Sequence, residues 1–330
     1  MAESFFAYNG RKKSDKRMET NAAFSIVPDQ VLYSSALNNS VITELLRQYP
    51  FLKSGEIGRS VMGKPLRYLS IGTGGKQLFY SAAWHANEWI TTPVLLKFAE
   101  DYARAYAAGQ PLGGFDTEKM YEDTTLFLVP MVNPDGVDLV NGMLESTGYE
   151  RQAEQIAADY PDIPYPSGWK ANIEGTDLNL QFPAGWERAR ETKFTLGYTS
   201  PAPRDYVGSA PLVAPESAAV AAFTGEHDFS MILAYHTQGE TIYWKYADYE
   251  PEDSYRIAQY FGTVSGYQVE QTPAESGYAG YKDWFIQTYN RPGYTIEVGR
   301  GVNPLPLSQF PQIYRDNLGI LLGGMSKVIK

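Results

Sequence analysis

The stretch that decides the fold is QLFYSAAW at residues 77–84, which the polar sequence HANE at residues 85–88 follows directly. This stretch is almost entirely apolar and shorter than an average helix, so it is typical of a strand buried on both faces of a sheet. Three other short apolar stretches repeat the pattern: TTLFLVPMV at 124–132, SMILAYH at 230–236 and YTIEV at 294–298. The sequence therefore predicts a sheet built largely from buried strands.

Segments with helical spacing separate these strands along the chain. Residues 40–49 predict a short amphipathic helix with an Asn or Ser cap, and residues 88–108 carry apolar side chains at helical intervals. LRYLSI at residues 66–71 predicts one more strand, which ends in a Gly-rich turn. Further helices are expected at residues 215–224, 251–261 and 307–328. Because strands alternate with helices, the expected fold class is α/β, with helices on both faces of the sheet.

The rest of the chain indicates one main domain. Residues 141–210 are rich in Gly, Pro, Tyr and charged residues. They predict long loops with one short helix, and long loops in a compact domain are usually functional. Residues 1–20 are polar and mixed in charge, and they predict a flexible N-terminal arm. No repeat and no Pro- or Ser-rich linker divides the remainder, so residues 21–330 are expected to form a single domain.

The composition excludes several classes of protein. The chain has 330 residues, a net charge of −10 and no cysteine, and its acidity argues against a nucleic-acid or anionic-membrane partner. No apolar run reaches the roughly 18–20 residues that span a bilayer, and no secretory signal is recognisable. A cytoplasmic location is therefore expected, with another export route left open. Without cysteine, any bound metal must be held by His, Asp or Glu.

Four polar side chains lie at the ends of these apolar strands. His85 and Glu88 follow the first strand at a spacing of three, His236 ends another, and Glu297 lies near the end of a third. Binding crevices of α/β sheets form at the carboxyl ends of strands. Two His and one Glu can hold a catalytic zinc ion with a position open for water, which a nearby carboxylate can deprotonate. The spacing alone is equally compatible with solvated or hydrogen-bonded residues at strand ends.

Two further motifs complete a family pattern. Asn133-Pro-Asp-Gly136 and Asp177-Leu-Asn179, in order with the four strand-end residues, resemble the zinc carboxypeptidase (funnelin) family. The resemblance extends from about Gly58 to the C-terminus. It implies a zinc carboxypeptidase-like fold, which has a central mixed, largely buried and twisted sheet with helices on both faces. It also implies that residues 21–330 are a single zinc peptidase catalytic domain.

The resemblance implies a role for each residue of the site. One zinc ion per chain would have three ligands: His85, Glu88 and His236. Glu297 would be the general base and proton shuttle, and Asp177 would accept a hydrogen bond from His85, which fixes the tautomer of the ring. Lys170 stands where the family has an arginine, and it would stabilise the oxyanion as a point charge. The alternative for Lys170 is a solvated lysine of a surface loop.

The sequence departs from conventional carboxypeptidases where those enzymes bind the terminal carboxylate of the substrate. Asn87 and Leu180 stand where the family has arginines, and leucine cannot form a bidentate pair with a carboxylate. Asn179 and Arg300 are expected to contact the substrate. If the protein is instead a carboxypeptidase of ordinary peptides, Arg300 or Arg291 would bind the terminal carboxylate.

The position of the family's catalytic tyrosine is ambiguous in this sequence. Tyr278 is expected to contact the substrate, with Tyr281 or a true loss as the alternatives.

Four sequence segments resemble one bacterial branch of the family: Trp169-Lys-Ala-Asn172, 177–183, 280–285 and 303–306. That branch comprises the γ-D-glutamyl-L-diamino acid (diaminopimelate) endopeptidases of the first type. It implies hydrolysis of the bond between γ-D-Glu and meso-diaminopimelate in murein-derived peptides, with no LysM module in this chain.

Lys282 lies in the segment that, in the family, forms the pocket for the residue after the cleaved bond. It is expected to bind the side-chain carboxylate of diaminopimelate, and Lys170 or Arg300 the carboxylate of D-Glu. The alternative for Lys282 is a solvated lysine on a helix.

Two other functions are compatible with the same residues. The first is a zinc carboxypeptidase that releases C-terminal residues from ordinary peptides with an unusual carboxylate anchor. The second is a catalytically idle module that keeps the metal and binds murein peptides. The presence of Glu297 argues against the idle module, because such a module has no use for a general base.

Overall fold

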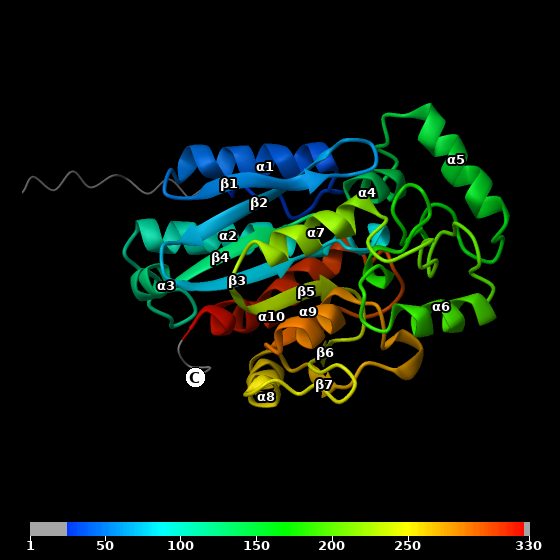
Figure 1. Cartoon of the computed structure of the whole chain (residues 1–330). Coiled ribbons are helices and arrows are strands. Elements are labelled where there is room, and N and C mark those ends of the chain that lie inside the picture. Colours follow the sequence, from blue (N-terminus) through cyan, green and yellow to red (C-terminus); the bar gives the residue numbers. More distant parts are fainter. Residues whose placement is uncertain (1–24, 327–330) are drawn as a thin grey trace, which may run out of the picture.

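A mixed sheet of eight strands forms the centre of the part of the chain that the structure describes, residues 25–326 of a computed structural model (Figure 1). The strands are β1 (Lys53–Arg59), β2 (Pro65–Gly72), β3 (Lys76–Ser81), β4 (Thr124–Val129), β5 (Phe229–His236), β6 (Thr241–Tyr243), β7 (Gln268–Glu270) and β8 (Gly293–Glu297). Their order in the sheet is β1-β2-β4-β3-β5-β8-β6-β7. The predicted flexible arm, residues 1–20, lies outside the described residues.

The four central strands β4, β3, β5 and β8 run parallel. Strand β2 pairs antiparallel with β1 and β4, and β6 pairs antiparallel with β8 and parallel with β7. Parallel strands place their carboxyl ends at the same edge of a sheet. The register aligns His236 at the end of β5 with Glu297 at the end of β8. The sheet therefore brings these two predicted site residues together across a long separation in sequence.

Helices cover both faces of the sheet, as the alternation of strands and helices predicts. The helices are α1 (Ser35–Gln48), α2 (Thr91–Ala107), α3 (Thr117–Asp123), α4 (Pro134–Val140), α5 (Thr147–Ala158), α6 (Trp186–Thr195), α7 (Pro215–Gly225), α8 (Ser254–Ser265), α9 (Tyr281–Tyr289) and α10 (Phe310–Met325). None of the helices between residues 25 and 326 combines the length and apolar character of a membrane span. The predicted α/β class, a mixed sheet with helices on both faces, is confirmed.

The two faces of β3 show why its central residues are apolar on both sides. Leu78 and Tyr80 pack into the larger core with apolar residues of α1, α2, α8 and α10. Phe79 points to the opposite face, where it packs with residues of α7 and α9. All three side chains are fully buried. Successive residues of a strand point to opposite faces, so a strand covered on both sides has no polar position to alternate with.

Several predicted boundaries differ from the structure. The helix predicted at 40–49 begins at Ser35, because the Ser34 side chain caps it by accepting a hydrogen bond from the Leu37 backbone N–H. Residues 141–210 contain two α-helices, α5 and α6, and not the single short helix that we expected. Helix α5 buries only Ala153 and Ala157, so it lacks the large buried apolar side chains that mark the predicted helix α2.

A buried carboxyl group ties α7 to the loops around the site. Glu216 is fully buried, and its carboxyl oxygens accept hydrogen bonds from the Val61 N–H at 3.1 Å and from Asn172 Nδ2 at 3.2 Å. Burial raises the pKa of Glu216 from its ordinary value to about 7. Asn172 lies two residues after Lys170, so Glu216 helps to hold the loop that carries this lysine.

Because the folded protein holds the Glu216 proton more tightly than the unfolded chain, its contribution to stability is greatest at low pH. The free energy of unfolding should fall as the pH rises from about 4.5 to about 7, and then level off. Glu216→Gln removes this titration. Relative to the variant, the parent should lose about 3 kcal/mol of stability between pH 5 and pH 8. Urea unfolding of both proteins at several pH values measures the difference in their free energies of unfolding. A difference that does not change with pH would contradict the raised pKa of Glu216.

Candidate metal and catalytic site

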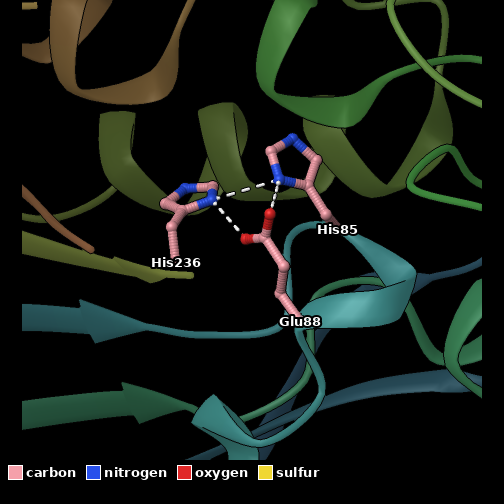
Figure 2. A group of neighbouring side chains, drawn as sticks. All are labelled: His85, Glu88 and His236. Carbon is pink, nitrogen blue, oxygen red and sulfur yellow. Dashed lines mark hydrogen bonds and ion pairs between the residues drawn. The ribbon is translucent and has the colours of Figure 1, made fainter. Parts of the chain in front are cut away.

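Three side chains meet at the carboxyl edge of the sheet (Figure 2). His85 follows the end of β3, Glu88 lies on the short 3-10 helix η1 (Ala86–Glu88), and His236 is the last residue of β5. His85 Nδ1 lies 2.9 Å from Glu88 Oε1, and His236 Nδ1 lies 3.0 Å from Glu88 Oε2. The two Nδ1 atoms are 3.3 Å apart. The structure thus brings together the three residues that the sequence predicts as metal ligands.

The donor atoms of this group fit a zinc ion. Two ligands at about 2.0–2.1 Å from a tetrahedral zinc lie about 3.3–3.4 Å from each other, close to the separation of the two imidazole nitrogens. Glu88 and His236 are 1% exposed and His85 9%, so ordinary solvation does not account for three polar groups that face one another. Two nitrogens and a carboxylate also form the donor set of open, catalytic zinc sites.

Asp177 supports His85 from the other side of the ring. His85 Nε2 lies 3.2 Å from Asp177 Oδ1, as the resemblance implies. The Asp177 carboxylate also accepts the backbone N–H groups of Asn179 and Asp205. Burial lowers the pKa of His85, but Glu88 and Asp177 outweigh burial and raise it to about 9. The carboxylate of Asp177 therefore orients the ring and increases its basicity.

Lys170 and Glu297 complete the charged centre. Lys170 Nζ lies 2.8 Å from Glu88 Oε1, so the structure contradicts the alternative of a solvated surface lysine. Glu297 is partly buried at the end of β8. Burial, and after it the negative charge of Glu88, raise the pKa of Glu297 to about 8. A carboxylate with a raised pKa is suited to accept and return a proton near neutral pH.

Two cavities meet at this centre. The first contains Asn179, Leu180 and Lys282 in its lining and is called the Lys282 cavity. The second is lined by Asn87, among others, and is called the Asn87 cavity. Four residues line both cavities and so mark their junction: Lys170, Arg204, Tyr243 and Glu297. A peptide that occupies both cavities would place the bond between its two halves beside these residues.

The structure places the predicted carboxylate anchors away from the site. Arg300 is 73% exposed at its side chain, forms an ion pair with Glu240 and lines neither cavity. Arg291 donates to the Phe229 carbonyl oxygen, at the start of β5, whereas the site lies at its end. Neither arginine lines either cavity in this structure, so contact of Arg300 or Arg291 with the substrate stays a prediction. Arginines near the ends of strands offer no local signal for which edge of the sheet they face.

The two candidate tyrosines also lie elsewhere. Tyr278 lines neither cavity, and its hydroxyl accepts a hydrogen bond from Arg188 Nη1 at 3.2 Å. Tyr281 is fully buried, with its hydroxyl 2.9 Å from Thr224 Oγ1. Neither tyrosine lines a cavity at the metal site in this structure, so contact of Tyr278 with the substrate stays a prediction.

Sequence reasoning missed two residues at the junction of the cavities. Tyr243 ends β6, which pairs with β8, and this pairing brings it near Glu297. Arg204 lies in the irregular segment between α6 and α7. Neither residue belongs to a motif or to a periodic pattern, so the sequence carries no local signal for either.

Comparison with known proteins gives consistent matches. The zinc carboxypeptidase family matches residues 39–319. The chain is 46% identical over 296 residues to "gamma-D-glutamyl-L-diamino acid endopeptidase 1" of Lysinibacillus sphaericus. The alignment covers 89% of this chain and 72% of that protein. It is 41% identical over 300 residues to "uncharacterized protein YqgT" of Bacillus subtilis (strain 168), with 90% and 78% covered. The crystal structure of thrombin-activatable fibrinolysis inhibitor has a TM-score of 0.69 at 18% identity, covering 91% of this chain and 75% of that one.

Proposed function

Because the chain belongs to the zinc carboxypeptidase family and is therefore a metallopeptidase, we propose that it hydrolyses the bond between γ-D-Glu and meso-diaminopimelate in murein stem peptides. The relative from Lysinibacillus sphaericus is named for this class of bond. One structural observation carries the proposal. Leu180 lines the Lys282 cavity where the family has an arginine for a terminal carboxylate. A substrate that continues beyond the leaving residue therefore meets no arginine at the position that, in conventional carboxypeptidases, binds a free C-terminus.

The chemistry is divided between one metal ion and two side chains. A zinc ion held by His85, Glu88 and His236, one per chain, would act as a Lewis acid that lowers the pKa of water and polarises the scissile carbonyl. Glu297 takes the proton from the attacking water and returns it to the leaving amine. Lys170 places a positive charge where negative charge develops on the carbonyl oxygen.

Lys282 gives the cavity its specificity for the leaving residue. Its ammonium group is buried, 2.6 Å from Asp283 Oδ1 and 2.7 Å from the Lys245 carbonyl oxygen. An ammonium group has three N–H donors, so one remains for the substrate in the Lys282 cavity. We propose that this donor binds the side-chain carboxylate of diaminopimelate, which a lysine residue in the same position lacks.

The test of Lys282 requires removal of the whole ion pair, because Lys282→Ala alone would leave Asp283 buried and uncompensated. The double variant Lys282→Met, Asp283→Asn should raise KM for diaminopimelate peptides about tenfold, with little change in kcat. KM for matched peptides with lysine in place of diaminopimelate should stay the same. Steady-state kinetics with both peptides provides the measurement, and an equal increase for both would remove Lys282 from this role.

The proposed function is tested by mass spectrometry of products from L-Ala-γ-D-Glu-meso-diaminopimelate-D-Ala. The expected fragments are L-Ala-D-Glu and diaminopimelate-D-Ala, and both should disappear after chelation of the metal. Release of D-Ala alone would show a carboxypeptidase. An uncut substrate that still binds would show the idle module, and either outcome would overturn the proposal. The cytoplasmic location, the absence of a LysM module and the single-domain organisation stay predictions.

A further inference from the structure

Arg204 occupies a fixed position between the two cavities. It follows Pro203, whose carbonyl oxygen accepts the backbone N–H groups of Lys170 at 2.7 Å and Ala171 at 2.9 Å. The segment that carries Arg204 is thus attached directly to the loop that carries the oxyanion lysine. Any movement of one backbone would require movement of the other.

Asp205 binds the Arg204 guanidinium group at its Nε atom. Its Oδ2 accepts Arg204 Nε at 2.6 Å, and its Oδ1 pairs with the buried Lys193 Nζ at 2.6 Å. The Asp205 backbone N–H donates to Asp177, the carboxylate that orients His85. These contacts fix the direction of the Arg204 side chain relative to the metal site. They engage only Nε, so within residues 25–326 the two terminal nitrogens have no hydrogen-bond partner.

The other cations that line the cavities are ammonium groups, each of which forms an ion pair, as Arg204 does with Asp205 through Nε. Lys170 is paired with Glu88, Lys193 with Asp205 and Lys282 with Asp283. Arg204 is the one guanidinium group among the described lining residues of either cavity. Its side chain is 41% exposed, so a ligand can reach it. A guanidinium group with two free terminal nitrogens is the side chain best shaped for a bidentate contact with a carboxylate.

We infer that Arg204 binds the free α-carboxylate of the γ-linked glutamyl residue on the acyl side of the scissile bond. This inference rests on the proposed function and extends it to the other half of the substrate. Lys282 lines only the cavity of the leaving residue, whereas Arg204 and Lys170 also line the Asn87 cavity. In a γ-glutamyl peptide the main-chain carboxylate is free and lies a short distance from the scissile carbonyl. An ordinary α-linked residue has no carboxylate there, so Arg204 selects for the γ linkage.

The test compares two substrates that differ only in this carboxylate. One is L-Ala-γ-D-Glu-meso-diaminopimelate, and the other carries the α-carboxamide in its place (γ-linked D-isoglutamine). The parent should prefer the free acid by about 10- to 100-fold in kcat/KM. Arg204→Gln should reduce the rate on the acid to that on the amide and leave the rate on the amide unchanged. Arg47→Gln, which alters an exposed, ion-paired arginine of α1, should keep the preference of the parent.

Binding of the product provides a readout that does not depend on turnover. Calorimetry should show tighter binding of L-Ala-D-Glu than of L-Ala-D-isoglutamine to the parent, and equal binding to Arg204→Gln. A preference that persists in Arg204→Gln, or a parent without preference, would overturn the inference. Failure of the proposed function is distinguishable, since it would leave both substrates uncut at the γ-D-Glu bond by every variant. Circular dichroism and zinc content check that each variant is folded.

Discussion

Glu297→Gln should lower kcat by about 10²–10⁴-fold, the usual contribution of a general acid–base group, while the protein keeps its zinc. The reason is the separation of roles at the edge of the sheet. The three ligand atoms come from His85, Glu88 and His236, and Glu297 is not among them. Glutamine has the same shape as glutamate but cannot accept the proton of the attacking water or return it to the leaving nitrogen.

The measurement combines steady-state kinetics on the diaminopimelate tetrapeptide with metal analysis of the same preparation. Glu226→Gln, at the C-terminal end of α7, is a matched control because it makes the same chemical change at a residue that lines neither cavity. Its activity should equal that of the parent. Near-normal turnover by Glu297→Gln would show that another group is the base. Loss of zinc together with loss of activity would show that Glu297 acts through the metal site instead.

Lys170→Met should lower kcat by about 10²–10³-fold and leave KM nearly unchanged, because an oxyanion contact acts mainly in the transition state. Methionine is unbranched like lysine and only one atom shorter, but it carries no charge. The backbone of this segment is held independently of the side chain: the Lys170 N–H donates to Pro203 and its carbonyl oxygen accepts the Ala86 N–H. The loop should therefore keep its position in the variant.

Lys170→Arg is the informative companion variant. It keeps the positive charge in a different shape, so it should recover part of the activity that Lys170→Met loses. Zinc content must be measured for both, because Lys170 also pairs with the ligand Glu88. An increase in KM with an unchanged kcat would contradict the prediction, since it would show that Lys170 contributes to substrate binding in the ground state and not to the transition state.

The metal centre could be predicted from the sequence because its signals are local. His85 and Glu88 follow directly on one apolar strand, and His236 ends another. A continuous apolar sequence indicates that a strand is buried on both faces, and parallel strands end at the same edge of the sheet. The residues before each ligand therefore predict its position at the end of a strand, and the resemblance to the zinc carboxypeptidases implies its role as a metal ligand. The structure then brought the three side chains within contact of one another.

The sequence by itself determined the fold class, the buried strands and the candidate ligands, since each depends on contacts between near neighbours or on the period of a strand. Only the tertiary structure decided what surrounds the scissile bond. It placed Arg300 on the surface with Glu240 and Arg204 at the junction of the two cavities. Arg204 reaches that junction through hydrogen bonds between irregular segments, Pro203 to Lys170 and Asp205 to Asp177. Irregular segments have no period, so their positions follow from packing alone.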